Sequence, residues 1–218
     1  PNIDRLAGEG GRCTDFYIVT SSCTPSRGAL LTGRYPLRNG LRHQLGRDEN
    51  WTGIGLPHSE RILPQYLKPA GYATGFIGKW HLSHPGVGNE KTTLSEPALR
   101  PEHQGFDLNI GGNQRGGPPS YFEPYKISNI TPRKEGDYLP ERLTDESIAF
   151  IEKNRDRPFF LSLWNYSVHY PIQAPQDLID KHTKRGTHKN PAYAAMIEGM
   201  DTALGHLLKA LDDLKLSD

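Results

Sequence analysis

One of the two cysteines in this chain stands where a helix is expected to begin. Cys23 follows Ser21 and Ser22, residue types that cap helix N-termini, and Pro25 suits the first helical turn. Backbone N–H groups at such an end are unpaired and favour an anion. Arg27, one turn further on, adds a guanidinium that can hold an oxyanion. A small buried cysteine and a reactive thiolate are both compatible with this position.

A second segment brings two basic side chains close together. The residues from Gly71 to Leu82 read GYATGFIGKWHL, and the first part alternates as a strand does. Lys79 and His81 are two residues apart, so both side chains point the same way if the backbone is extended. A solvated lysine and a surface histidine at a strand end would show the same pattern. Taken alone, this segment leaves both interpretations open.

Together the two segments resemble the signatures of one enzyme family. Residues 23–27 (CTPSR) and 31–36 (LTGRYP) are similar to the C-x-P-x-R signature of the type I sulfatases, and residues 71–82 are similar to their second signature. The resemblance implies that Cys23 is a modified residue, oxidised to Cα-formylglycine by a formylglycine-generating or sulfatase-maturating enzyme. It also implies an alkaline-phosphatase-like α/β fold, with a mixed, mostly parallel sheet flanked by helices on both faces.

The implied modification has a chemical reason. A hydrated aldehyde carries two hydroxyls on one carbon, and one of them attacks the sulfur of a sulfate ester to give a covalent sulfo-enzyme intermediate. The other, once deprotonated, collapses back to the aldehyde and expels sulfate, an exit that serine or unmodified cysteine lacks. By resemblance, Arg27 holds the anion beside Cys23, Lys79 contacts the sulfate and stabilises formylglycine, and His81 assists the hydroxyl that expels sulfate.

A third motif follows a nearly continuous apolar run. Residues 158–164 (PFFLSLW) predict a strand buried on both faces, and residues that follow such strands line the active sites of α/β sheets. Residues 164–171 (WNYSVHYP) resemble the H-x-P segment of the sulfatases. His169 is therefore expected to bind the substrate sulfate and to act as a general acid or oxyanion donor. The alternative is a histidine that only caps the strand end.

The resemblance also implies a divalent cation, usually calcium, held by hard oxygen ligands. Beside a formylglycine oxygen from Cys23, the site needs an Asp-Asp pair and an Asp-Asn pair, and neither is expected within these 218 residues. The adjacent Asp212 and Asp213 are interpreted as the solvated face of a helix. We therefore expect residues 1–218 to form one partial catalytic domain, incomplete at both ends, that binds calcium weakly and is inactive by itself.

Residues 86–140 form the least regular part of the sequence, with Gly-Gly pairs at 111–112 and 116–117. Long loops of this kind are usually functional or mobile. Arg115 and Tyr121 join Lys79 and His169 as candidate substrate-binding residues, because aromatic faces beside polar groups suit a sugar ring. Resemblance to bacterial polysaccharide-degrading sulfatases favours a sulfated glycan, while a sulfated small molecule such as an aryl sulfate stays open.

The remaining pattern alternates helices with strands, as in an α/β layer structure. Helices are predicted over residues 2–10, 62–70, 144–154 and 192–214, and strands over 13–19, 72–78 and 158–164.

The charge balance of 26 basic against 25 acidic residues excludes a general attraction to nucleic acid. No apolar run approaches the roughly 20 residues of a membrane span. The chain starts at Pro1 with no signal-like segment, so a periplasmic, cell-surface, secreted or lysosomal location is expected by resemblance only.

Three functions stay open at this point. The first is a sulfuric ester hydrolase. The second is a phosphate or phosphonate ester hydrolase of the same superfamily, since some of these also use formylglycine. The third is a non-catalytic pseudoenzyme, which would keep an unmodified thiol at Cys23. The Gly-Lys-Trp-His-Leu segment at 78–82 favours the sulfatase.

Overall fold

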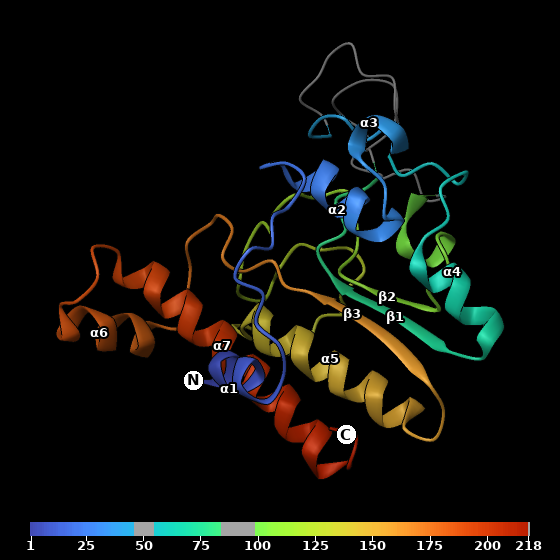
Figure 1. Cartoon of the computed structure of the whole chain (residues 1–218). Coiled ribbons are helices and arrows are strands. Elements are labelled where there is room, and N and C mark those ends of the chain that lie inside the picture. The colour runs from blue at the N-terminus through green and yellow to red at the C-terminus, as the bar shows by residue number, and fades with distance from the viewer. Residues whose placement is uncertain (46–54, 84–98, 218) are drawn as a thin grey trace. The chain divides into compact units, whose positions relative to one another are not determined.

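The computed structural model describes residues 1–45, 55–83 and 99–217, and within them the chain forms two compact units (Figure 1). Each unit combines segments that are distant in the sequence. The sheet unit comprises Asp15–Gly116 and Asp156–Trp164, and the helical unit comprises Pro1–Thr14, Gly117–Arg155 and Asn165–Asp218. The expectation of one partial catalytic domain over 1–218 stays a prediction.

The sheet unit is built on three parallel strands, β1 (Ala73–Gly78), β2 (Leu108–Ile110) and β3 (Phe159–Trp164), seen side by side in Figure 1. Their order is β2-β1-β3. The central strand β1 is buried along its whole length, as strands inside parallel sheets are. In β3 only Ser162 is fully buried. The predicted strand at 158–164 is therefore confirmed, but its full burial on both faces is wrong, since its other residues are only partly buried.

Short helices and loops pack on this sheet. The helical elements of the sheet unit are α2 (Cys23–Thr32), α3 (Pro36–Asn39), α4 (Leu63–Leu67), η1 (Lys68–Ala70) and η3 (Pro101–His103). An apolar cluster joins α2 and several loop residues to β1, and it consists of Leu31, Leu41, Leu56, Ile62, Phe76, Trp80, Leu82 and Phe106. The rings of Phe76 and Trp80 meet edge to face, with centroids 5.0 Å apart. This cluster packs Phe76 of β1 and residues just after the strand together with Leu31 of α2, the helix that begins at Cys23.

The helical unit is organised around its longest helix. This helix, α7 (Pro191–Asp213), contacts α1 (Asn2–Glu9), α5 (Leu139–Asn154) and α6 (Gln176–Arg185). Its buried face is made largely of small or flexible residues: Ala195, Met196, Gly199 and Ala203. A Cβ at Gly199 would stand 2.9 Å from the ring of Tyr138, so glycine lets this aromatic side chain approach the helix.

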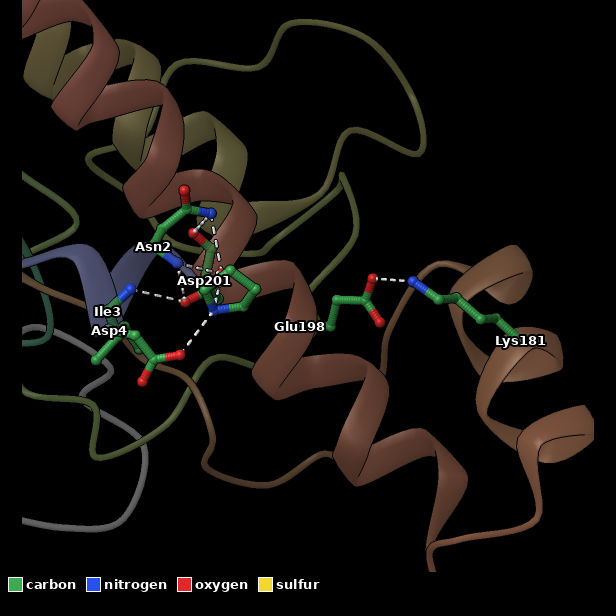
Figure 2. A network of polar contacts seen from close by, with 7 residues as sticks. Asn2, Ile3, Asp4, Lys181, Glu198 and Asp201 are labelled. Carbon is green, nitrogen blue, oxygen red and sulfur yellow. Dashed lines mark hydrogen bonds and ion pairs between the residues drawn. The ribbon is translucent and has the colours of Figure 1, made fainter.

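Polar contacts also fix the neighbours of α7 (Figure 2). The buried carboxylate of Asp201 accepts hydrogen bonds from the backbone N–H groups of Asn2, at 3.1 Å, and Ile3, at 2.9 Å, so it satisfies donors of the first turn of α1. Glu198 forms an ion pair with Lys181 of α6 and a 2.8 Å hydrogen bond with His182 Nε2. One helix thereby anchors two others through carboxylates.

Most predicted elements are confirmed, with some differences. Helix α5 begins at Leu139 rather than Thr144, because Pro140 is accommodated in its first turn. The pattern did not predict α3, α6, β2 or η3, which are short or polar. The strand predicted over 13–19 is wrong: these residues form no regular element, and Phe16, Tyr17 and Ile18 are exposed. Residues 86–98 of the irregular region lie outside the described residues. No helix among the described residues has the length and apolar character to cross a bilayer.

Candidate functional site

Cys23 is the first residue of α2 and is half-buried, whereas Cys13 is exposed. The preceding turn is closed by hydrogen bonds from the Ser22 backbone N–H to Thr20 Oγ1, at 2.9 Å, and from Ser26 Oγ to the Thr20 carbonyl, at 2.6 Å. Ser22 has the extended backbone of an N-cap residue but makes no side-chain cap. The predicted helix start is therefore confirmed: Cys23 lies in the first turn of α2, where the Thr24 backbone N–H donates to Gln44 Oε1 at 3.4 Å.

Lys79 immediately follows β1 and is buried. Its Nζ lies 3.3 Å from the Sγ of Cys23, and its backbone N–H donates to the Trp164 carbonyl at 2.8 Å. The preceding residue is Gly78, with φ +107°. Glycine is needed at this position because a Cβ would clash with the same Trp164 carbonyl. Burial and the positive charge of Arg27 lower the pKa of Lys79, while the contact with Cys23 acts in the opposite direction.

Arg27 connects α2 to the segment that carries Lys79. Its Nη1 donates to the Lys79 carbonyl at 2.5 Å, and its guanidinium lies over the ring of Trp164, 4.8 Å from the ring centroid. The guanidinium thus supports the backbone at Lys79 as well as adding positive charge near Cys23. The sequence predicted the second role and not the first.

His81 is held by its backbone in an uncommon conformation. Its φ is +57°, in the left-handed region that few non-glycine residues adopt. The backbone N–H donates to the Asn113 carbonyl at 2.9 Å, and the carbonyl accepts from Thr24 Oγ1 at 3.1 Å. Gln44 Nε2 lies 3.2 and 3.3 Å from the two ring nitrogens. The predicted extended backbone is therefore wrong at His81.

The sheet unit nevertheless brings four of the predicted residues into one contact network: Cys23, Arg27, Lys79 and His81. Trp80 and Leu82, which alternate with the two basic residues, enter the apolar cluster. Arg115 also belongs to this unit and is exposed, and its backbone N–H donates to Asn113 Oδ1 at 2.8 Å. Sequence patterns missed Gln44, because a glutamine in a loop belongs to no motif or periodic face.

The helical unit holds the other two predicted residues. His169 is exposed, and its Nδ1 lies 3.0 Å from the Tyr170 carbonyl; a carbonyl only accepts, so Nδ1 carries the proton and Nε2 is the ring nitrogen left to act. The Tyr121 ring is fully buried. Its hydroxyl lies 2.8 Å from the Tyr166 carbonyl and 3.0 Å from the His169 carbonyl, and its backbone N–H donates to Gln173 Oε1. In this unit Tyr121 supports the loop of His169 and offers no ring face to a sugar.

The residues around Cys23 do not fit a metal ion by themselves. Among residues 1–45, 55–83 and 99–217, no group of three or more His, Cys, Asp or Glu side chains is placed to hold one. The charged groups that contact or adjoin Cys23 are the cations Lys79 and Arg27. Asp212 pairs with Arg5 and Asp213 with Lys209, as expected for a solvated helix face. A calcium ion would need carboxylates from beyond the described residues, so calcium stays a prediction.

Comparisons with known proteins identify the family of the chain. The model of the Sulfatase family matches residues 1–218. The chain is 33% identical over 245 residues to N-acetylgalactosamine-6-sulfatase of Homo sapiens, covering 100% of this chain and 43% of that protein. It is 33% identical to arylsulfatase A of Homo sapiens, covering 99% and 44%. The chain therefore spans less than half the length of these relatives.

One solved structure shows the similarity in three dimensions. Ps i-CgsB in complex with k-i-k-neocarrahexaose matches with a TM-score of 0.80 and 29% identity, covering 100% of this chain and 50% of that chain. The match confirms the predicted α/β fold class with a parallel sheet and flanking helices.

Proposed function

The chain belongs to the sulfatase family, and we propose that the full-length protein hydrolyses a sulfate ester, with modified Cys23 as its nucleophilic residue. The observation that carries the proposal is the 3.3 Å separation between Lys79 Nζ and Cys23 Sγ. This contact sets a buried cation beside the one side chain that the C-x-P-x-R motif marks for oxidation. The N-terminus of α2 adds a second preference for an anion at the same point.

The surroundings of Cys23 fit a formylglycine. The side chain is only half-buried, so it is open to substrate, and the Lys79 ammonium supplies hydrogen-bond donors within reach. When present, formylglycine supplies a hydrated aldehyde whose hydroxyl is the nucleophile toward sulfur. Lys79 then binds sulfate oxygens and balances the negative charge that develops on them. Arg27 fixes Lys79 through its carbonyl and adds a second positive charge.

The two histidines are proposed to move protons. His81 is fixed at its backbone N–H and at its carbonyl, so its imidazole has a defined place from which to accept a proton from a hydroxyl at position 23. In the helical unit, the Tyr170 carbonyl keeps a proton on His169 Nδ1, and the imidazolium form of this ring would donate its second proton, on Nε2, to a leaving alcohol.

We propose a sulfated glycan as the substrate class. This proposal is supported by one relative that is an N-acetylgalactosamine-6-sulfatase and by one similar structure that holds k-i-k-neocarrahexaose. Arg115 is exposed in the sheet unit, and Tyr170, next to His169, is 75% exposed in the helical unit. An exposed tyrosine offers the ring face that buried Tyr121 lacks. The maturation enzyme and the location outside the cytoplasm stay predictions from family resemblance.

The test uses the full-length protein co-expressed with a formylglycine-generating enzyme. Mass spectrometry of the peptide that contains Cys23 should show the mass loss of oxidation to the aldehyde. Sulfate release from an aryl sulfate and from sulfated oligosaccharides should be detectable by ion chromatography, and Cys23→Ala should abolish it. Faster turnover of the matched aryl phosphate would instead favour a phosphate ester hydrolase. A thiol that stays unmodified, with no turnover of either ester, would favour a pseudoenzyme.

A further inference from the structure

A closed set of hydrogen bonds links Thr24, Gln44 and His81 within the sheet unit. Fully buried Thr24 donates from Oγ1 to the His81 carbonyl at 3.1 Å and accepts from the Leu45 backbone N–H at 3.4 Å. The Thr24 backbone N–H donates to Gln44 Oε1 at 3.4 Å. The Gln44 amide nitrogen in turn contacts the His81 ring. The residue after Cys23 therefore holds both the backbone of His81 and the side chain that touches its imidazole.

These contacts determine which way the Gln44 amide faces. Its oxygen meets the Thr24 N–H, so its NH₂ group faces the imidazole; the reverse orientation would bring two donors together at Thr24. An NH₂ group only donates. Whichever ring nitrogen of His81 accepts the bond must therefore carry a lone pair. The amide therefore favours the neutral imidazole, and because it occupies the one lone pair of that form, its bond must be released when the same nitrogen takes up a proton.

The charged groups around His81 act in the same direction. Among the described segments that contact it (α2, residues 41–45, 79–83 and 113–116), none carries a carboxylate. Their ionisable side chains are Cys23, Arg27, Arg42, His43, Lys79 and Arg115. Like charges disfavour the imidazolium. A glutamate at position 44 would therefore add a carboxylate to segments that otherwise carry none, and it would lie beside the imidazole of His81.

We propose that Gln44 is a positioning residue for the hydrolysis: it orients the imidazole of His81 and disfavours its imidazolium form until the ring takes up a proton. This inference rests on the proposed function, in which His81 accepts a proton from a hydroxyl at position 23. Gln44 acts through His81 and does not touch the reacting atoms.

The test compares three variants of the full-length protein. Gln44→Glu brings a carboxylate to the ring and stabilises the imidazolium, so the acidic limb of the pH profile of kcat/KM should move to higher pH by about one unit or more. Gln44→Met keeps the length of the side chain but removes the donor, so kcat should fall about 10- to 100-fold with little change in KM. Gln176→Glu makes the same charge change on exposed α6 and should leave the profile unchanged.

Rates are normalised to the formylglycine content at position 23, measured by mass spectrometry, because Gln44 also contacts the residue after Cys23. The position of a pH limb does not depend on the amount of folded enzyme, so partial misfolding of a variant would not mask the result. The role of Gln44 would be overturned if the acidic limb of the pH profile did not move in Gln44→Glu and kcat in Gln44→Met equalled that of the wild type. A wild-type protein with oxidised Cys23 that releases no sulfate would refute the proposed function instead.

Discussion

The Nζ of Lys79 lies 3.3 Å from the Sγ of Cys23, although 56 positions separate the two residues in the chain. The contact joins the start of α2 to the end of β1, where Gly78 turns the backbone with φ +107°. Under the proposed function, one motif would supply the residue to be modified, and the other supplies the buried side chain of Lys79 beside it.

Lys79→Met should therefore reduce kcat/KM of the full-length protein about 100- to 1000-fold, as the loss of an oxyanion donor does elsewhere. The measurement is sulfate release from an aryl sulfate, with the formylglycine content of each sample determined by mass spectrometry. Lys209→Met, at a lysine of α7 that is 71% exposed, serves as the matched control and should retain wild-type activity. Unchanged turnover by fully modified Lys79→Met would exclude Lys79 from sulfate binding.

Gly116 should be needed to leave space for the imidazole of His81. A Cβ at Gly116 would stand 2.7 Å from Cε1 of that ring, well inside the roughly 3.5–4.0 Å at which carbon atoms pack. Gly116→Ala is expected to push the ring aside and to reduce kcat on the order of 100-fold, because small displacements of catalytic groups are costly. Steady-state kinetics on an aryl sulfate tests this expectation.

The control for this change is Gly8→Ala, since a Cβ there meets nothing within 4 Å. It lies in α1 and should raise the free energy of unfolding by about 0.5–1 kcal/mol while leaving turnover alone. Wild-type kinetics in Gly116→Ala would mean that the His81 ring can move without affecting the reaction.

Sequence motifs predicted the candidate site residues that can be identified by their side-chain chemistry. Cys23, Arg27, Lys79 and His81 belong to motifs, and the structure brings them into one contact network. Sequence motifs did not predict the backbone conformations and strand pairing that depend on tertiary packing. The left-handed backbone of His81 follows from its bonds to Asn113 and Thr24, which are remote in sequence. An apolar run such as residues 13–19 has the composition of a strand, but a strand also needs a pairing partner.

Tyr121 is a single residue whose burial the sequence did not predict. An aromatic residue in a Gly- and Pro-rich loop suggested a sugar platform, yet its ring is fully buried and burial raises its pKa, so its hydroxyl stays a neutral donor. Tyr121→Phe would leave the carbonyls of Tyr166 and His169 without this donor. We expect the free energy of unfolding to fall by about 1–2 kcal/mol and kcat to fall as the His169 loop loosens.

Urea unfolding and steady-state kinetics on a sulfated oligosaccharide test this expectation. Tyr193→Phe, at a partly exposed position of α7, is the control for removal of a hydroxyl. A raised KM with unchanged stability and unchanged kcat would instead support direct binding of substrate by Tyr121.

Asp201 should stabilise the helical unit in a manner that depends on pH. Burial alone would raise the pKa of its carboxyl, but the N–H groups of Ile3 and Asn2 outweigh burial and hold the pKa below the ordinary value of 3.8 (Figure 2). A carboxylate whose pKa is lower in the folded state contributes full stability above its unfolded-state pKa. That contribution is lost as pH falls through the folded-state pKa.

Asp201→Ala is therefore expected to lower the free energy of unfolding by about 2–4 kcal/mol at neutral pH, since buried donors of α1 lose a charged acceptor. Asp201→Asn keeps one acceptor oxygen and should cost less. The difference between wild type and Asp201→Asn should be constant from pH 7 to 5 and should shrink below about pH 4, where the wild-type carboxylate becomes protonated. Urea unfolding across this range measures it, with Asp213→Asn, an exposed carboxylate on the same helix, as the control. A difference that stays the same down to the lowest pH would show that Asp201 acts through its shape and not through its charge.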